Sequence, residues 1–206
     1  MKKILFIDHY DSFSFNLIDW IGQYSGEYSI ERIPFDRMKE SFYDPFSGLY
    51  PLVLSPGPHE PGLIEPTLKL IDQSFGKLPI LAVCLGHQAV LHTLGGKIVS
   101  CENPLHGSAR RIKFNGQSKI YAANSTISVA TYNSLCMTVE SDYKDAITAY
   151  NDWNEIEACE FWDLSYACLS CQFHPESFMS HGVEPLAKAY IAEVQRFFAT
   201  VNRASL

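Results

Sequence analysis

Short apolar runs alternate with amphipathic stretches through the first half of the chain. Continuous apolar runs are typical of strands that are covered on both faces, as in a parallel sheet. Apolar side chains at helical spacing predict helices between these runs, the first of them capped by Asp11 or Ser12. We expect strands over residues 3–8, 28–33, 50–55 and 78–83, and helices near 13–25, 66–75 and 86–94. This alternation predicts a doubly wound, mostly parallel sheet.

The pattern changes after residue 94. The segments that follow are short, rich in strand-forming residues and separated by turns, over 108–114, 126–132, 136–141, 146–150, 156–162 and 166–173. They predict antiparallel extensions of the same sheet or a small second sheet. A final helix near 183–201 carries one apolar stripe, made of Leu186, Tyr190, Val194, Phe197 and Val201. We expect this stripe to pack on the sheet rather than to bind a partner.

The whole chain, residues 1–206, is expected to form a single domain, because it has no internal repeat, low-complexity stretch or linker. Its hydrophobic fraction of 47% supports a sizeable core, and its charged fraction of 19% is far from that of a disordered chain. The predicted fold class is therefore α/β, with a doubly wound, mostly parallel central sheet, antiparallel extensions and flanking helices.

Charge and hydropathy restrict the partners. The formal net charge is −7, and no basic run is longer than two residues, which argues against nucleic acid and anionic membrane as partners. The first apolar run is shorter than the roughly 7–15 residues of a signal-peptide core. No run approaches the roughly 20 apolar residues that cross a bilayer. We expect a cytoplasmic protein whose partner is a small molecule or another protein.

Six cysteines are present, at positions 84, 101, 136, 159, 168 and 171. A chain with this much core does not need disulfides, so we expect reduced, mostly buried thiols. The spacing Cys168-x-x-Cys171-x-x-His174 raises a metal hypothesis. Zinc usually takes four ligands, and residues three apart in an extended segment point to opposite faces, so we expect no metal site.

One of these cysteines, Cys84, lies where a buried strand gives way to a helix. Ligands of α/β sheets bind beyond the carboxyl ends of the strands, and the N-terminus of a helix favours a thiolate. Ala82 and Gly86 supply the small flanks that a sharp strand–turn–helix elbow needs. Gln88 follows one helical turn later and can face the same pocket. A structural cysteine is the alternative; the nucleophile hypothesis requires a base.

The stretch CQFHPES offers that base. Pro175 favours an extended backbone before it, so His174 and Glu176 project to the same side. Glu176 can then hold one ring nitrogen of His174 while the other addresses Cys84. Taken alone, this stretch also fits an ordinary loop.

An oxyanion site requires backbone N–H groups beside the thiol. Leu85 supplies one candidate. Gly57, which follows a strand in LVLSPGPHEPG, supplies another because glycine lets the backbone approach a ligand closely. A plain proline-glycine turn is the alternative here.

Together these pieces resemble the class I, triad-type glutamine amidotransferases. The chain is most similar to the small subunits of anthranilate synthase and aminodeoxychorismate synthase. The resemblance spans residues 3 to about 182 and is carried, in the family's order, by LFIDHYDSFSFNL, VLSPGP, LAVCLGHQAV, LGGKIV, HGS, YNSL and CQFHPES.

The resemblance implies a glutaminase with a Cys-His-Glu triad. Cys84 would attack the carboxamide carbon of glutamine, His174 would move the proton, and Glu176 would hold the imidazole. Gly57 and Leu85 would donate N–H groups to the oxyanion. No cofactor is implied. The glutamine-binding positions of the family correspond to Gly57, Pro58, Leu85, Gln88, Ser134 and Leu135.

The implied partner is the large subunit of a chorismate-using synthase, which would receive ammonia through a buried path and form anthranilate or 4-amino-4-deoxychorismate. The resemblance covers both the tryptophan and the folate pathway. Two other interpretations stay open: an amidotransferase that serves another synthetase, and an inactive homologue that acts as a structural partner subunit. The second gains support from departures from the family's usual residues, at His59, Ser108, Thr131 and Asn133.

Overall fold

A nine-stranded mixed sheet forms the centre of the computed structural model, which describes residues 2–41, 43–139 and 141–204. The strand order is β2-β1-β3-β4-β11-β10-β9-β6-β7. The first five of these strands are mutually parallel, and the remaining pairs are antiparallel. The expectation of a mostly parallel core with antiparallel extensions is confirmed.

The four inner strands of the parallel half are almost fully buried, because helices cover both of their faces, whereas the edge strand β2 is only partly buried. The central strands of this half therefore consist of continuous apolar runs such as Ile80–Val83. The five strands are β1 (Lys3–Asp8), β2 (Ser29–Pro34), β3 (Leu52–Leu54), β4 (Ile80–Val83) and β11 (Cys168–Cys171).

The second half of the chain supplies both of the arrangements that its pattern allowed. Four strands extend the main sheet: β6 (Ser108–Phe114), β7 (Thr126–Thr131), β9 (Ile147–Asn151) and β10 (Ile156–Phe161). The other two, β5 (Lys97–Ser100) and β8 (Leu135–Thr138), pair with each other in a small separate sheet.

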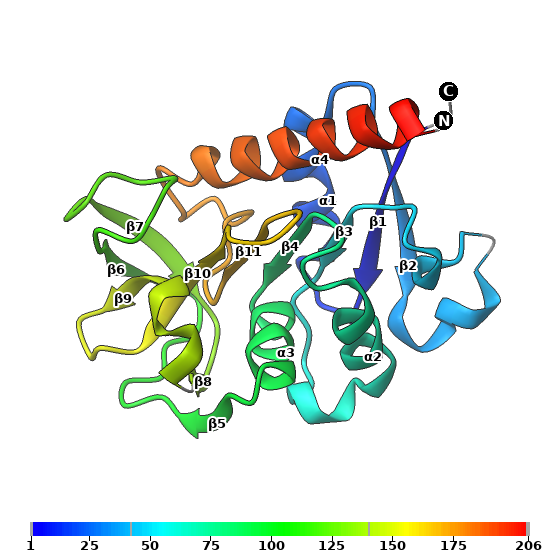
Figure 1. Cartoon of the computed structure of the whole chain (residues 1–206). Coiled ribbons are helices and arrows are strands. Elements are labelled where there is room, and N and C mark those ends of the chain that lie inside the picture. The colour runs from blue at the N-terminus through cyan, green and yellow to red at the C-terminus, as the bar shows by residue number, and fades with distance from the viewer. Residues whose placement is uncertain (1, 42, 140, 205–206) are drawn as a thin grey trace.

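Four α-helices cover the main sheet in two layers, with α1 and α4 on one face and α2 and α3 on the other (Figure 1). The stripe on α4 packs inward as expected, and Tyr190 donates a hydrogen bond to the carbonyl of Leu52 in β3 at 3.0 Å. The helices are α1 (Ser14–Ser25), α2 (Glu65–Ser74), α3 (Leu85–Thr93) and α4 (Glu184–Ala204). Short 3₁₀ segments lie at Phe35–Glu40, Pro45–Ser47, Pro61–Leu63 and Ser141–Ala146. Within the described residues, no helix combines the length and the apolar character needed to span a membrane.

The start of α1 differs from the prediction. The N-cap residue is Phe13, whose side chain makes no capping bond, rather than Asp11 or Ser12. The Asp11 carboxylate accepts a hydrogen bond from the backbone N–H of Phe13 at 2.8 Å and so closes the turn before the helix. An aspartate that caps a helix and an aspartate that closes the turn before it occupy similar positions in a sequence, so spacing alone does not distinguish them.

The expectation of reduced thiols is wrong for two of the six cysteines. Cys101 and Cys136 form a disulfide, whereas the other four are free and buried. The pairing of β5 with β8 brings the two residues together, with a Cα–Cα distance of 5.4 Å across 35 positions of sequence. Neither strand pairing nor register could be read from the spacing of the cysteines.

Two buried histidines, His9 and His87, make the fold sensitive to acid. Burial lowers the pKa of His9 from 6.5 to about 4 and that of His87 to about 3. Both stay neutral in the folded protein, so below pH 6.5 the unfolded chain binds more protons at these sites. The contribution of each of these histidines to the free energy of unfolding should therefore fall by about 2 kcal/mol between pH 7 and pH 5, while the raised pKa values of Glu157 and His174 act in the opposite direction.

Chemical denaturation at the two pH values measures this loss. The Nδ1 atom of His87 hydrogen-bonds the Ser170 hydroxyl at 2.9 Å, and an asparagine can keep that bond without titrating. His87→Asn should therefore weaken the pH dependence, while His181→Gln, at an exposed site, should leave it unchanged. An identical slope in the His87→Asn variant would contradict the assignment.

Candidate active site

Cys84 occupies the sharp turn between β4 and α3. Its backbone has φ = 51° and ψ = −106°, a region that residues other than glycine rarely adopt. The turn is held on both sides, since the Cys84 N–H donates to the carbonyl of Cys171 at 2.8 Å and its carbonyl accepts from the N–H of Gln88 at 3.0 Å. The structure therefore presents the thiol on an elbow of the kind that places nucleophiles.

The small residues that flank the elbow are required by packing. A Cβ atom at Gly86 would lie 2.5 Å from the carbonyl oxygen of Leu54, so no other residue fits without moving the backbone of β3. Ala82 is fully buried within β4. Both observations agree with the sequence argument for a close-packed elbow.

His174 and Glu176 follow β11, the strand that pairs with β4. The pairing is parallel and places Cys171 opposite Val83, so the chain leaves both strands at the same edge of the sheet. Nδ1 of His174 lies 2.6 Å from Oε1 of Glu176, and both side chains are buried. The structure thus joins this histidine and carboxylate beside Cys84, as the sequence predicted.

The charge state of His174 is set by two opposing effects. Burial lowers the pKa of the imidazole. Hydrogen bonds to Cys84 and Glu176, together with the charges of these two groups, raise the pKa by more than burial lowers it. The net result is a His174 pKa well above the ordinary value of 6.5. A protonated imidazole is therefore favoured beside the Cys84 sulfur.

Aromatic rings hold the imidazole from two other directions. The ring centroid of Tyr132 lies 4.9 Å from that of His174, and the ring centroid of Phe13 lies 5.5 Å away, both in edge-on contact. The backbone N–H of His174 also donates to the carbonyl of Ala130 at 3.0 Å. These contacts restrict both the ring plane and the position of the histidine.

A cavity of about 260 Å³ opens beside Cys84. Five of the six residues predicted to bind glutamine line it, namely Gly57, Pro58, Gln88, Ser134 and Leu135. Leu85 does not line the cavity with them. Four further lining residues were not predicted as binding residues: His59, His106, Tyr132 and Asn133.

Gly57 is held in close contact with the first strand–helix connection. A Cβ atom at this position would lie 2.6 Å from both Cβ of His9 and Cδ2 of Leu85. The His9 ring is itself fixed by Ser55 and Thr67, with Nε2 3.0 Å from the Thr67 hydroxyl. The side chain of Leu85 therefore supports the Gly57 loop from behind, which explains its absence from the cavity wall.

Gln172 is a site residue that the sequence argument missed. Its side-chain amide lies 3.6 Å from the Cys84 sulfur, and its carbonyl oxygen accepts a hydrogen bond from Gln88 at 3.0 Å. A signal was present, because Gln172 precedes His174 by two residues in an extended segment, and alternate residues share a side.

Four residues noted in the sequence differ from those usual in the family. Two of them, His59 and Asn133, line the cavity, and the other two lie in a strand pair. His59 lines the cavity and packs against Phe35, with ring centroids 5.8 Å apart. Asn133 also lines the cavity. Ser108 and Thr131, by contrast, pair with each other in the β6–β7 ladder and do not line the cavity. Thr131 directly precedes two residues that do line it, Tyr132 and Asn133.

The metal hypothesis on Cys168, Cys171 and His174 finds no converging donor set among the described residues. Among all the residues that the structure describes, one group of three potential ligands lies close enough to hold a metal ion, and it consists of Cys101, Cys136 and Glu155. The two sulfur atoms of this group are bonded to each other.

Comparisons with known proteins agree with this geometry. Residues 5–192 match the family model "Glutamine amidotransferase class-I". The chain is 36% identical to aminodeoxychorismate synthase component 2 of Escherichia coli, over 86% of this chain and 92% of that protein. It is 35% identical to the aminodeoxychorismate/anthranilate synthase component 2 of Bacillus subtilis, over 89% of this chain and 93% of that protein.

Two further comparisons concern length and fold. The chain is 30% identical to the bifunctional protein TrpGD of Thermotoga maritima, but it spans only 32% of that protein's length. The crystal structure of a glutamine amidotransferase of Thermotoga maritima superimposes with a TM-score of 0.69, over 95% of this chain and 84% of that chain, at 16% identity. This likeness shows the fold. The family match over nearly the whole length, together with the elbow and the buried histidine–glutamate pair, places the chain in the class I glutamine amidotransferases.

Proposed function

We propose that the chain is the glutaminase subunit of a chorismate-using synthase. The observation that carries this proposal is the series Cys84–His174–Glu176, which stands at a strand–helix elbow beside a cavity lined by five of the six predicted glutamine-binding residues. A cytoplasmic location stays a prediction from the sequence.

The proposed reaction starts from the state in which the Cys84 proton already lies on His174. The thiolate attacks the carboxamide carbon of glutamine and forms a tetrahedral oxyanion. The imidazolium of His174 then gives its proton to the leaving nitrogen, the C–N bond breaks, and ammonia departs. Glu176 holds the imidazole through Nδ1 and stabilises its positive charge until that proton is given up.

Water completes the cycle. His174 takes a proton from a water molecule, the hydroxide attacks the γ-glutamyl thioester, and the C–S bond breaks to release glutamate and regenerate the thiolate. No redox change or cofactor enters this balance.

The oxyanion is proposed to bind backbone N–H groups of Gly57 and Leu85. Leu85 is the first residue of α3, so its N–H has no acceptor within the helix. The close contact of Gly57 with His9 and Leu85 keeps the loop at a fixed distance from the thiol. Such preorganised donors stabilise charge that develops in the transition state.

The partner is proposed from the relatives, whose names are those of synthase components. Ammonia is protonated in bulk water at neutral pH, so it must pass directly to the partner of this chain. The two segments that carry Phe13 and His174 also expose three aromatic side chains, those of Tyr10, Phe15 and Phe178. Exposed aromatic side chains of this kind are enriched at protein interfaces, which supports docking of the partner at this end of the sheet.

Reconstitution with each candidate large subunit tests the proposal. The chain is mixed separately with the large subunit of anthranilate synthase and of aminodeoxychorismate synthase, and glutamate release and glutamine-dependent product are followed together. We expect stoichiometric glutamate and product with at least one of them. If neither mixture uses glutamine while both synthases work with added ammonium, the chain is an inactive structural partner and the proposal is wrong.

A further inference from the structure

The disulfide links β8, whose first residue lines the cavity beside Cys84, to the residue that follows β5. Cys136 belongs to β8, and Cys101 comes immediately after the end of β5. In the β5–β8 pairing Val99 lies opposite Cys136, and Ser100 lies opposite Leu135. Ser134 and Leu135, two of the proposed glutamine-binding residues, therefore directly precede a bonded cysteine.

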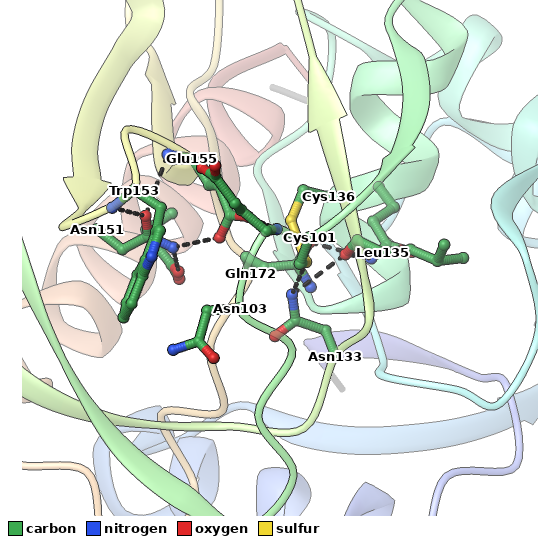
Figure 2. Close-up of a disulfide and its surroundings, with 12 residues drawn as sticks. Cys101, Asn103, Asn133, Leu135, Cys136, Asn151, Trp153, Glu155 and Gln172 are labelled. Carbon is green, nitrogen blue, oxygen red and sulfur yellow. Dashed lines mark hydrogen bonds between the residues drawn. A yellow bond between two sulfur atoms is a disulfide. The ribbon is translucent and has the colours of Figure 1, made fainter.

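Direct contacts connect the disulfide to that segment. The backbone N–H of Cys101 donates to the carbonyl of Ser134 at 2.9 Å. The side-chain amide of Asn133 lies 3.3 Å from the Cys101 sulfur and donates to the carbonyl of Leu135 at 3.1 Å (Figure 2). Cys101 thus holds the carbonyl of Ser134 directly and is connected to the carbonyl of Leu135 through the Asn133 side chain.

The same carbonyl continues the series to the nucleophile. Gln88 donates to the carbonyl of Leu135 at 3.0 Å and to the side chain of Gln172 at 3.0 Å, and Gln172 reaches the Cys84 sulfur at 3.6 Å. A shift of the Leu135 carbonyl would therefore alter the contacts of Gln88 inside the glutamine cavity. These contacts therefore connect the disulfide to the Cys84 sulfur without a break.

The disulfide can be approached from the side away from glutamine. Cys136 lines a second cavity of about 320 Å³ together with Val99, whose side chain is exposed. Neither Cys101 nor Cys136 lines the cavity beside Cys84. Cys101 and Cys136 are themselves buried, so a small dithiol must enter through this second cavity to reach the bond, and there it does not compete with the substrate.

A metal is a poor alternative occupant of this cluster. Glu155 would be the third ligand, but its two carboxylate oxygens already accept hydrogen bonds from the N–H of Glu102, the Asn151 amide and Arg110 (Figure 2 shows the Asn151 contact). A carboxylate so engaged offers little to a cation, and the two sulfurs alone fall short of the four ligands of a structural zinc site.

We propose that Cys101 and Cys136 form a reversible thiol–disulfide site that controls the affinity of the glutamine pocket. A dithiol reductant supplies two electrons and two protons, the S–S bond breaks, two thiols form, and the dithiol becomes a cyclic disulfide. A small disulfide oxidant such as oxidised glutathione reverses the change and leaves as two thiols. This inference rests on the proposed function of the pocket.

The direction follows from what the bond holds in place. Two unbonded sulfur atoms need more room than a bonded pair, so reduction separates β5 from the start of β8 and releases the 133–135 segment. We expect the KM for glutamine to rise about fivefold on reduction, at the lower end of couplings between distinct sites. The kcat should change less, because Cys84 and His174 are held by β4 and β11.

The experiment uses the chain in complex with the large subunit that supports its activity. The isolated chain is oxidised with oxidised glutathione and verified under denaturing conditions, where four rather than six of its thiols should react, and it is then combined with the large subunit. Glutamate release against glutamine concentration is then measured before and after treatment with dithiothreitol. Synthase activity with ammonium is measured in parallel and should not change.

Matched variants separate this bond from other thiols. Cys101→Ser and Cys136→Ser should each show the KM of the reduced enzyme in both conditions. Cys159→Ser, which replaces a buried free cysteine of β10, should keep the full response to dithiothreitol.

Each other outcome decides against the inference in a different way. Six reactive thiols after oxidation would show that the bond does not form. A verified disulfide with equal KM in both states would make it a structural cross-link only. If no glutamate is released in either state while ammonium supports synthesis, the proposed function is wrong, and control of glutamine affinity is rejected with it.

Discussion

Replacement of Cys84 by serine should abolish glutamine-dependent synthesis, with a loss of at least about 10³-fold in kcat. A hydroxyl is a far weaker nucleophile than a thiolate, so serine at the elbow cannot attack the carboxamide carbon at a comparable rate. Glutamate release in the reconstituted complex measures the effect. Synthesis from added ammonium should persist, because it bypasses the elbow.

Cys159→Ser is the matched control, since Cys159 is also buried and free. Burial raises the pKa of its thiol far above the ordinary value, so it contributes no thiolate near neutral pH. This variant should retain glutaminase activity. Undiminished glutamate release by Cys84→Ser, with the folded state verified by thermal unfolding, would remove Cys84 from the role of nucleophile.

Replacement of His174 by alanine should reduce turnover almost as severely as the loss of Cys84, whereas Glu176→Gln should have a much smaller effect. The base moves the proton in both half-reactions, while the carboxylate acts through it, so we expect a loss about 10²-fold smaller for Glu176→Gln. A glutamine can still accept the Nδ1–H bond that Glu176 Oε1 makes at 2.6 Å. Single-turnover measurements with the partner present compare the two variants.

The pH dependence of kcat/KM tests whether Glu176 positions and charges His174 or only supports the fold. The charge of Glu176 is one cause of the raised pKa of His174, so its removal should lower that pKa. The imidazolium is then lost at lower pH, and the high-pH limb of kcat/KM should shift to lower pH. Glu184→Gln, at an exposed carboxylate, is the control. Equal losses of turnover in His174→Ala and Glu176→Gln would contradict the roles assigned here. An unshifted high-pH limb in Glu176→Gln would contradict them as well.

The features that the sequence predicted best are those set by local chemistry. Continuous apolar runs predicted the central parallel strands, because burial on both faces leaves no room for alternation. The placement of Cys84 at a strand–helix junction followed from the small residues around it, and the pairing of His174 with Glu176 followed from the extended backbone that Pro175 imposes. Each inference needed only a few neighbouring residues.

The features that the sequence did not predict depend on contacts between distant segments. The disulfide required the register of β5 and β8, which 35 positions of intervening chain conceal. The position of Leu85 behind the Gly57 loop required the packing of α3 against the connection that carries His9. The contact between Gln172 and Cys84 required the order of strands in the sheet.

The position of β11 between β4 and β10 also decides when the site is assembled. Residues 84 and 172 touch although 88 positions separate them along the chain, and contacts of such long range form late because a large loop must close first. A growing polypeptide can form β4 and α3 while the segment with His174 is still being synthesised, but the turn at Cys84 gains its bond to the Cys171 carbonyl only when β11 is added. Until the last central strand inserts, the thiol has no base, so no glutamine is consumed and no ammonia is released by an unfinished molecule.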